Sequence, residues 1–129
     1  NSNQQFIYSL RRMLDPVKEH VDNNFNPLPA EYINEFASIR QKINDLMKMS
    51  CEQIETNRYE NYREILAEAD ACKDELSVLR KKHIDRLQNM KDNSLMQISL
   101  VYLNILQESQ EFLSVMRHQL RAAKKFMEA

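Results

Sequence analysis

Residues 33–54 read INEFASIRQKINDLMKMSCEQI, and the spacing of apolar residues in this stretch decides the fold. Apolar or small side chains recur at alternating intervals of three and four, which places them on one face of an α-helix. They are Ile33, Phe36, Ile39, Ile43, Leu46, Ser50 and Ile54. Because only one face is apolar, the pattern predicts an amphipathic helix that packs against neighbours.

The same spacing returns twice further along the chain. The second apolar stripe consists of Tyr62, Ile65, Ala69, Cys72, Leu76, Leu79, His83, Leu87 and Met90. The third consists of Leu95, Ile98, Tyr102, Ile105, Ser109, Phe112, Met116, Leu120 and Ala123. The sequence therefore predicts three long helices in succession.

Glycine is absent from all 129 residues, whereas average usage would give about nine. Hairpins, phosphate-binding loops and strained catalytic turns depend on the positive φ angles that glycine adopts freely. The three prolines, Pro16, Pro27 and Pro29, all lie in the first quarter of the chain. This composition favours long helices with short links and argues against chemistry carried by loops.

The N-terminal segment predicts a shorter helix that ends near Asn23. Its apolar residues, at helical spacing, are Phe6, Leu10, Met13, Val17 and Val21. Asp15-Pro16 predicts a kink or a restart, and the asparagine- and proline-rich residues 23–29 predict a linker, with Pro29 opening the next helix. We therefore divide the chain into a lead-in helix with its linker, residues 1–26, and a helical bundle, residues 27–129.

Two capping boxes mark the predicted helix starts after that linker. Asn57 with Glu60 precedes the second apolar stripe, and Ser94 with Gln97 precedes the third. Links this short join only antiparallel neighbours. The predicted fold is all-α: an up-and-down antiparallel bundle of three long helices, with an N-terminal lead-in helix that either adds a fourth or projects from it.

Charge and cysteine content narrow the classes of function. The formal net charge is −1, which gives no bulk attraction to nucleic acid. Cys51 and Cys72 lack metal-ligand spacing and are expected to be buried thiols of a reducing compartment. No apolar run is long enough to span a membrane. The chain begins with Asn1 and not with methionine, so we expect either a processed chain or a piece of a larger protein, which leaves room for membrane segments upstream.

Acidic residues lie on the predicted outer face of two helices. Asp70 and Asp74 are four residues apart and point away from the apolar stripe, and Gln107 and Glu111 repeat this spacing on the last helix. Carboxylates on adjacent turns can chelate a cation. The alternative is a solvated acidic face that pairs with nearby lysines.

Basic residues gather near the end of the last predicted helix: Arg117, His118, Arg121, Lys124 and Lys125. The helix dipole favours cations at this end without any ligand. The functional alternative is contact with anionic lipid headgroups or with a partner protein. A second basic cluster consists of Arg80, Lys81, Lys82 and Arg86.

No residue pattern indicates catalysis. His83 falls in an apolar stripe, which predicts a buried, hydrogen-bonded core histidine. His20 and His118 have no serine or cysteine placed beside them as a nucleophile. A metal-dependent enzyme on a bundle would need inward Glu-x-x-His ligands, which the stripes lack. We therefore expect no enzymatic activity.

Two segments resemble the PhoU-like domain of bacterial sodium/phosphate cotransporters. They are residues 102–112, YLNILQESQEF, continued by SVMRHQLRAAKKF at 114–126, and residues 68–76, EADACKDEL. The resemblance covers residues 30–126. It implies a three-helix PhoU repeat with a regulatory role in phosphate uptake, at the cytoplasmic face of the inner membrane, contacting the transporter's membrane part or a cytosolic regulatory protein.

The resemblance also implies a surface-bound metal, either a divalent cation or an iron- or zinc-type ion. Asp70 and Asp74 match one acidic signature of the family, and Glu111 completes the site. Gln107 replaces the leading acidic residue of the second signature. For membrane or partner contact, Arg117, Arg121 and Lys125 are the expected residues.

Another class of function remains open on this sequence. The chain could be a soluble helical scaffold that self-associates into a homo-oligomer through apolar residues flanking the last stripe, such as Val101, Leu106 and Leu113. A phosphate-signalling adaptor that is not fused to a transporter is the other alternative.

Overall fold

The structure is a computed structural model that describes residues 2–25 and 28–128. These residues form four α-helices and include no β-strand. The helices are α1 (Ser2–Phe25), α2 (Ala30–Thr56), α3 (Tyr62–Gln88) and α4 (Asn93–Glu128). The prediction of an all-α helical bundle is confirmed. The predicted linker residues 26 and 27, and the side chain of Phe6, lie outside the part that the structure describes.

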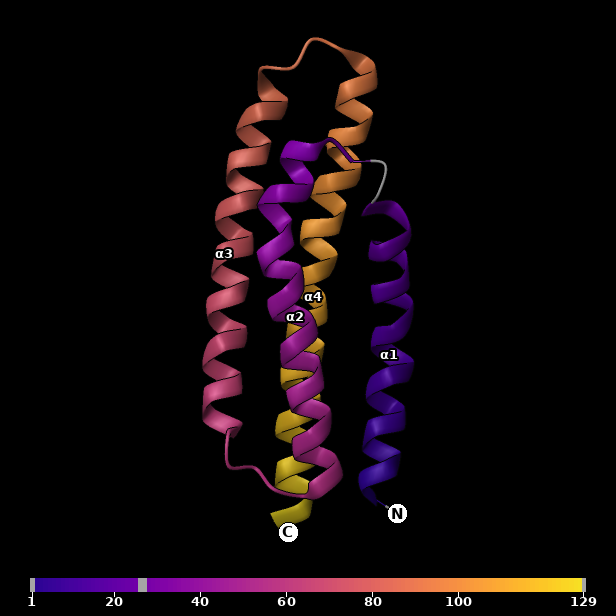
Figure 1. The fold of residues 1–129 in the computed structure, drawn as a ribbon, viewed down its shortest axis with the longest axis vertical. Helices are drawn as coiled ribbons and strands as arrows, with labels where there is room; N and C mark the ends of the chain where they lie inside the picture. Colours follow the sequence, from indigo (N-terminus) through magenta and orange to yellow (C-terminus); the bar gives the residue numbers. More distant parts are fainter. Residues whose placement is uncertain (1, 26–27, 129) are drawn as a thin grey trace.

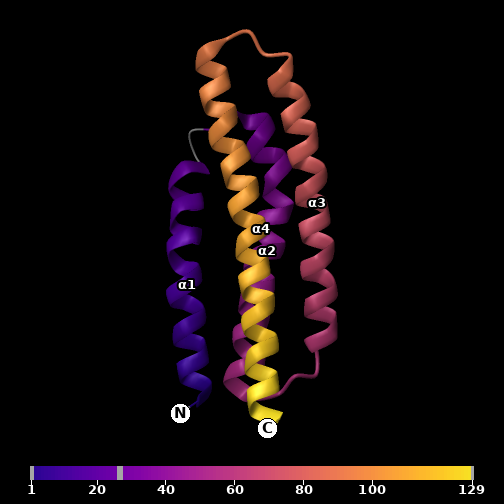
Figure 2. The same cartoon turned by 180° about the vertical axis from the view of Figure 1, so that it is seen from behind.

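Consecutive helices run in opposite directions, as short links require (Figure 1). α1 and α3 lie on opposite flanks, with α2 and α4 on the two faces between them (Figures 1 and 2). α4 packs against all three other helices, whereas α1 and α3 do not touch over their described residues. α4 is therefore the central element of the bundle.

α1 is the fourth helix of this bundle and does not project from it. Leu10 and Leu14 are fully buried, and Val21 is also buried. α1 continues through Pro16, where the sequence predicted a kink or a restart. Buried side chains on both sides of Pro16 hold the helix against its neighbours, which offsets the backbone hydrogen bond that proline cannot make.

The core follows the predicted stripes along the shared axis of the bundle. Its largest fully buried side chains are Tyr102, Phe36, Leu10, Leu14, Ile54, Ile65, Leu76, Ile105, Leu106, Leu113, Met116 and Leu120. Ser50 and Ser109 are buried as the stripes predicted, and Ser109 donates to the carbonyl of Ile105 at 2.7 Å. In α2 the stripe starts at Tyr32, which is buried, whereas Ile33 is half-buried.

Both predicted capping boxes are wrong. Asn57 ends α2 in the left-handed conformation, with φ 53° and ψ 33°, instead of opening the next helix. Asparagine tolerates this conformation better than most residues, so it can close a helix where glycine is absent. At α4 the capping residue is Asp92, whose Oδ1 accepts from the backbone N–H groups of Ser94 and Leu95.

The α3–α4 turn extends past the start of α2 (Figures 1 and 2). The first residues of α4 therefore have fewer helices to pack against than its middle. Leu95 and Ile98, predicted to be core residues, are exposed for this reason, as are Leu100 and Val101. Ser99 takes the buried position in this part of α4.

Candidate functional site

A basic hollow of about 460 Å³ lies where α3 begins and α4 ends. We call it the basic hollow; it is lined by Tyr62, His118, Arg121, Ala122, Lys124, Lys125 and Glu128. The start of α1 lies at the same end of the bundle (Figure 1). Two of the residues predicted for membrane or partner contact, Arg121 and Lys125, are thus brought together.

Acidic side chains of the described residues oppose only part of the positive charge in this hollow. Lys124 pairs with Glu128, and its Nζ lies 5.0 Å from the centre of the Tyr62 ring. Within residues 28–128, no ion pair involves His118, Arg121 or Lys125. The hollow is therefore an electropositive surface that can attract an anion.

Arg117, the third predicted contact residue, is turned toward α3 instead. Its guanidinium lies 3.2 Å from each carboxylate oxygen of Asp70. The pair bridges α3 and α4, and because about half of the Asp70 side chain is exposed it contributes little to stability. Arg117 and Asp70, predicted for two different roles, are thus partners of each other.

The residues predicted as metal ligands lie on the surface. Asp70, Asp74 and Glu111 are all exposed, and Asp70 faces Arg117. Over residues 2–25 and 28–128, no cluster of three or more His, Cys, Asp or Glu side chains is arranged to hold a metal ion. Metal binding at these three residues stays a prediction, to be checked by elemental analysis of the purified chain with and without Asp70→Ala.

The outer residues of α4 meet α3 through Gln110 rather than through Gln107. The Gln110 amide donates to the carbonyl of Lys73 at 3.0 Å and to Ser77 Oγ at 2.8 Å. Its oxygen accepts from Arg80 at 3.0 Å. Gln107 and Glu111 are exposed, so the bridge to α3 is made by Gln110, which lies between them in sequence, and not by the pair that the sequence indicated.

A polar and aromatic cluster is buried near the opposite end of the bundle. The rings of Tyr32 and Tyr102 stack at 4.7 Å, and the His83 ring meets both edge-on at 4.8 Å. His83 Nε2 donates to the backbone carbonyl of Ser99 at 2.9 Å, which fixes the proton on that nitrogen. The prediction of a buried, hydrogen-bonded core histidine is confirmed. Burial lowers the His83 pKa, so the ring is held neutral.

Glu35 closes this cluster at its edge. Arg86 donates to both of its carboxylate oxygens, at 2.8 and 2.6 Å, and Lys82 donates at 2.8 Å. The hydrogen bonds from Arg86, followed by that from Lys82, hold the pKa of Glu35 at about 2 against desolvation. Lys82 and Arg86, which belong to the second basic cluster of the sequence, thus bind a carboxylate of the protein itself.

Sequence reasoning missed most of this cluster. His83 and Tyr102 stood in predicted apolar stripes, but Tyr32, Glu35 and Ser99 were not identified. The available signal was that two polar aromatic residues interrupt stripes of aliphatic side chains. The residues that contact one another in this cluster are distant in sequence. Glu35 and Arg86, for example, are separated by 51 positions.

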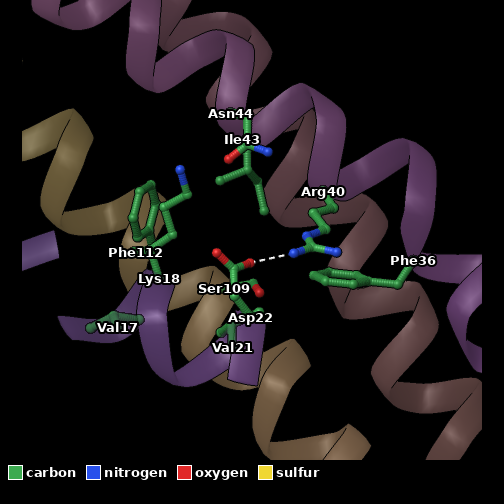
Figure 3. Close-up of a pocket in the computed structure, with 10 residues that line it drawn as sticks. All are labelled: Val17, Lys18, Val21, Asp22, Phe36, Arg40, Ile43, Asn44, Ser109 and Phe112. Atoms are coloured by element: carbon green, nitrogen blue, oxygen red, sulfur yellow. Dashed lines mark hydrogen bonds and ion pairs between the residues drawn. The ribbon is translucent and has the colours of Figure 1, made fainter. Parts of the chain in front are cut away.

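The contact between α1 and α2 leaves a small apolar hollow of about 30 Å³, enough for a water molecule. Figure 3 shows Arg40 of α2 and Asp22 of α1 facing each other across it, joined by an ion pair. Phe36, Phe112 and Ser109 form part of its wall. This ion pair and the contact of His20 with Glu108, at 3.4 Å, tie α1 to the bundle.

The two cysteines differ in their surroundings. Cys72 is buried, as predicted, and desolvation raises the pKa of its thiol to about 11. Cys51 is half-buried rather than buried, and burial raises its pKa as well. Cys51 lines a second hollow between α1 and α2 together with Arg11 and Glu55.

The apolar flank predicted for self-association is only partly exposed. Val101 is exposed, but Leu106 and Leu113 are fully buried, so the prediction is wrong for these two residues. The reason is that α4 has neighbours on three sides, which leaves it a wider buried face than one stripe suggests.

Comparisons of this chain with protein-family models, with curated proteins and with solved structures find no match. None of the four described helices has the length and apolar character needed to cross a bilayer.

Proposed function

We propose that this chain is a regulatory and interaction domain of a sodium-dependent phosphate transporter, located at the cytoplasmic face of the inner membrane. In this proposal α2, α3 and α4 form a PhoU-like three-helix unit, and α1 leads into it from the membrane part. The domain acts through contacts of its helix faces and catalyses no reaction. The resemblance of residues 30–126 to PhoU-like domains supports this family.

The observation that carries the proposal is the position of the basic hollow. It lies at the same end of the bundle as the start of α1 (Figure 1). If a membrane part precedes α1, this end of the bundle faces the bilayer. Each arginine or lysine close to an anionic lipid surface contributes about 1 kcal/mol of attraction. Arg121 and Lys125 are then the contact residues at the membrane surface.

The way in which α1 is packed supports a role in transmission. α1 contacts both α2 and α4, and it is joined to them by the ion pair of Asp22 with Arg40 and the contact of His20 with Glu108. A displacement of α1 by the membrane part would therefore also displace α4, the central helix of the bundle. The proposed mechanism is conformational.

Phosphate uptake by cells that express the complete gene tests this proposal. We expect Arg121→Glu with Lys125→Glu to change sodium-dependent uptake at least threefold, because both substitutions reverse charges that face the membrane. The matched control, Lys81→Glu with Lys91→Glu, makes the same charge change at exposed positions elsewhere and should leave uptake within about 1.5-fold. Absence of sodium-dependent phosphate uptake with the unaltered gene would contradict the proposal.

One observation favours a self-associating scaffold as a second candidate. Leu95, Ile98, Leu100 and Val101 are each exposed on the first turns of α4, where the α3–α4 end projects. Exposed apolar groups of this kind mark interaction surfaces. Sedimentation of the purified chain over a range of concentrations would show a dimer that Leu100→Glu dissociates. A monomer at all concentrations would exclude this candidate.

A further inference from the structure

We propose that the basic hollow is a binding site for a phosphate group that carries two or more negative charges. The group belongs either to a lipid headgroup, such as a phosphomonoester lipid, or to a free oligophosphate. This inference rests on the proposed function, whose basic end it explains, and names the chemistry that this end recognises.

The charge balance of the hollow favours a bound anion. The hollow is lined by three cationic or protonatable groups without an ion-pair partner in the described chain, His118, Arg121 and Lys125. Among the described residues that line it, the one acid, Glu128, is paired with Lys124. Elsewhere acids on neighbouring helices pair with cations, as Glu35 does with Arg86 and Asp70 with Arg117. The charge left over in the hollow matches an anion supplied from outside.

The donors of the hollow are arranged along one face of α4. His118, Arg121 and Lys125 stand at intervals of three and four on α4, so they form one strip with Cβ atoms about 5–6 Å apart. A guanidinium fork binds two oxygens of one phosphate, and an ammonium group adds a compact point charge. The side chains of His118, Arg121 and Lys125 can therefore converge on one phosphate group from the α4 side of the hollow.

The hollow also has room for a small anionic group. Its volume of about 460 Å³ is within the range of small-ligand sites. The small side chain of Ala122 forms part of its wall and leaves room between the longer cationic side chains. Tyr62, on the opposite wall, is the first residue of α3, so the positive end of that helix dipole adds to the attraction.

Two measurements on the 129-residue chain distinguish the sources of the phosphate group. One is calorimetric titration with sodium tripolyphosphate. The other is co-sedimentation with phosphatidylcholine vesicles, with and without phosphatidic acid. We expect saturable binding in at least one of them, and the measurement that responds identifies the source. No binding to either probe at low ionic strength would overturn the inference.

Substitutions then test the location. Arg121→Gln with Lys125→Gln should weaken binding at least tenfold, because it removes two of the donors. Lys81→Gln with Lys91→Gln removes the same charge elsewhere and should change affinity less than twofold. Equal losses in both variants would show a net-charge effect and overturn the site. Circular dichroism should confirm that both fold, since all four side chains are exposed.

The outcomes separate this inference from the proposed function. If the gene supports sodium-dependent uptake but the purified chain binds neither probe, the phosphate site alone is wrong. If the chain binds a probe at Arg121 and Lys125 but the gene supports no such uptake, the transporter assignment alone is wrong.

Discussion

Glu35 is a residue whose ionisation is strongly coupled to the fold. Its side chain is 14% exposed and receives hydrogen bonds from Arg86 and Lys82, both on α3. Its pKa is about 2 in the folded chain, compared with an ordinary value of 4.5. Between these values the unfolded chain binds more protons, so stability is present above pH 4.5 and is lost as the pH falls toward 2.

Glu35→Gln should therefore lower the free energy of unfolding at pH 7 by about 3 kcal/mol, because a pKa difference of one unit corresponds to about 1.4 kcal/mol. It should also reduce the decline in stability between pH 4.5 and 2. Urea unfolding at a series of pH values measures both effects. Glu31→Gln, at a carboxylate that is 69% exposed, is the control and should cost less than about 1 kcal/mol. Equal costs for the two variants would contradict the importance assigned to Glu35.

His83 predicts a second pH dependence, in a different range. Burial lowers its pKa below the ordinary value of 6.5, so the unfolded chain takes up a proton first as the pH falls. The stability due to neutral His83 is present above pH 6.5 and is lost below it. His83→Gln keeps a donor for the Ser99 carbonyl but cannot titrate, so it should flatten the stability curve between pH 7 and 5.5. An unchanged slope in His83→Gln would refute the assignment.

At the scale of the helices, the interiors were predictable from the sequence and the ends were not. Periodic burial over many residues defines a helix, whereas a capping box consists of two residues and also occurs by chance. Asn57 fits the pattern of a helix start, yet it ends α2 because a left-handed residue closes that helix. Asp92 precedes Ser94 by two positions and caps α4 in its place.

These two candidates for the cap of α4 can be compared directly. Asp92→Ala removes the oxygen that accepts from two backbone N–H groups and should lower stability by about 1 kcal/mol. Ser94→Ala removes a hydroxyl that no hydrogen bond in the described chain uses and should change stability by less than about 0.5 kcal/mol. Thermal unfolding of both variants measures the difference. A larger loss of stability in Ser94→Ala than in Asp92→Ala would support a capping box at Ser94 instead.

The basic hollow shows a similar division between what was and was not predictable. Its α4 side could be recognised from residues three and four apart on one helix. Its α3 side, Tyr62, could not, because the relative height of two helices depends on the packing of the whole core. The same limit explains why Asp70 and Arg117 were assigned separate roles although they are partners.

At the scale of the whole molecule, the sequence left the position of α1 open. Its apolar stripe fits a fourth bundle helix and a projecting helix equally well, since both need one apolar face. The structure places Leu10 and Leu14 in the same core as the stripes of the other helices. α1 is thereby expected to unfold together with α2, α3 and α4.

Leu14→Ala tests this integration. Truncation of a fully buried leucine should lower the free energy of unfolding by about 2–5 kcal/mol, and the chain should still unfold in one transition. Far-ultraviolet circular dichroism and tyrosine fluorescence, followed together in urea, should give the same midpoint. Met13→Ala, at a neighbouring side chain that is 47% exposed, should shift that midpoint little.

Loss of helix in two separate steps would show that α1 unfolds on its own. A displacement of α1 could then be absorbed within that helix without reaching α4. A single transition means that α1 cannot move far without disturbing the core that it shares with α4. Since α4 carries the basic hollow, this coupling is what a conformational role at the membrane requires.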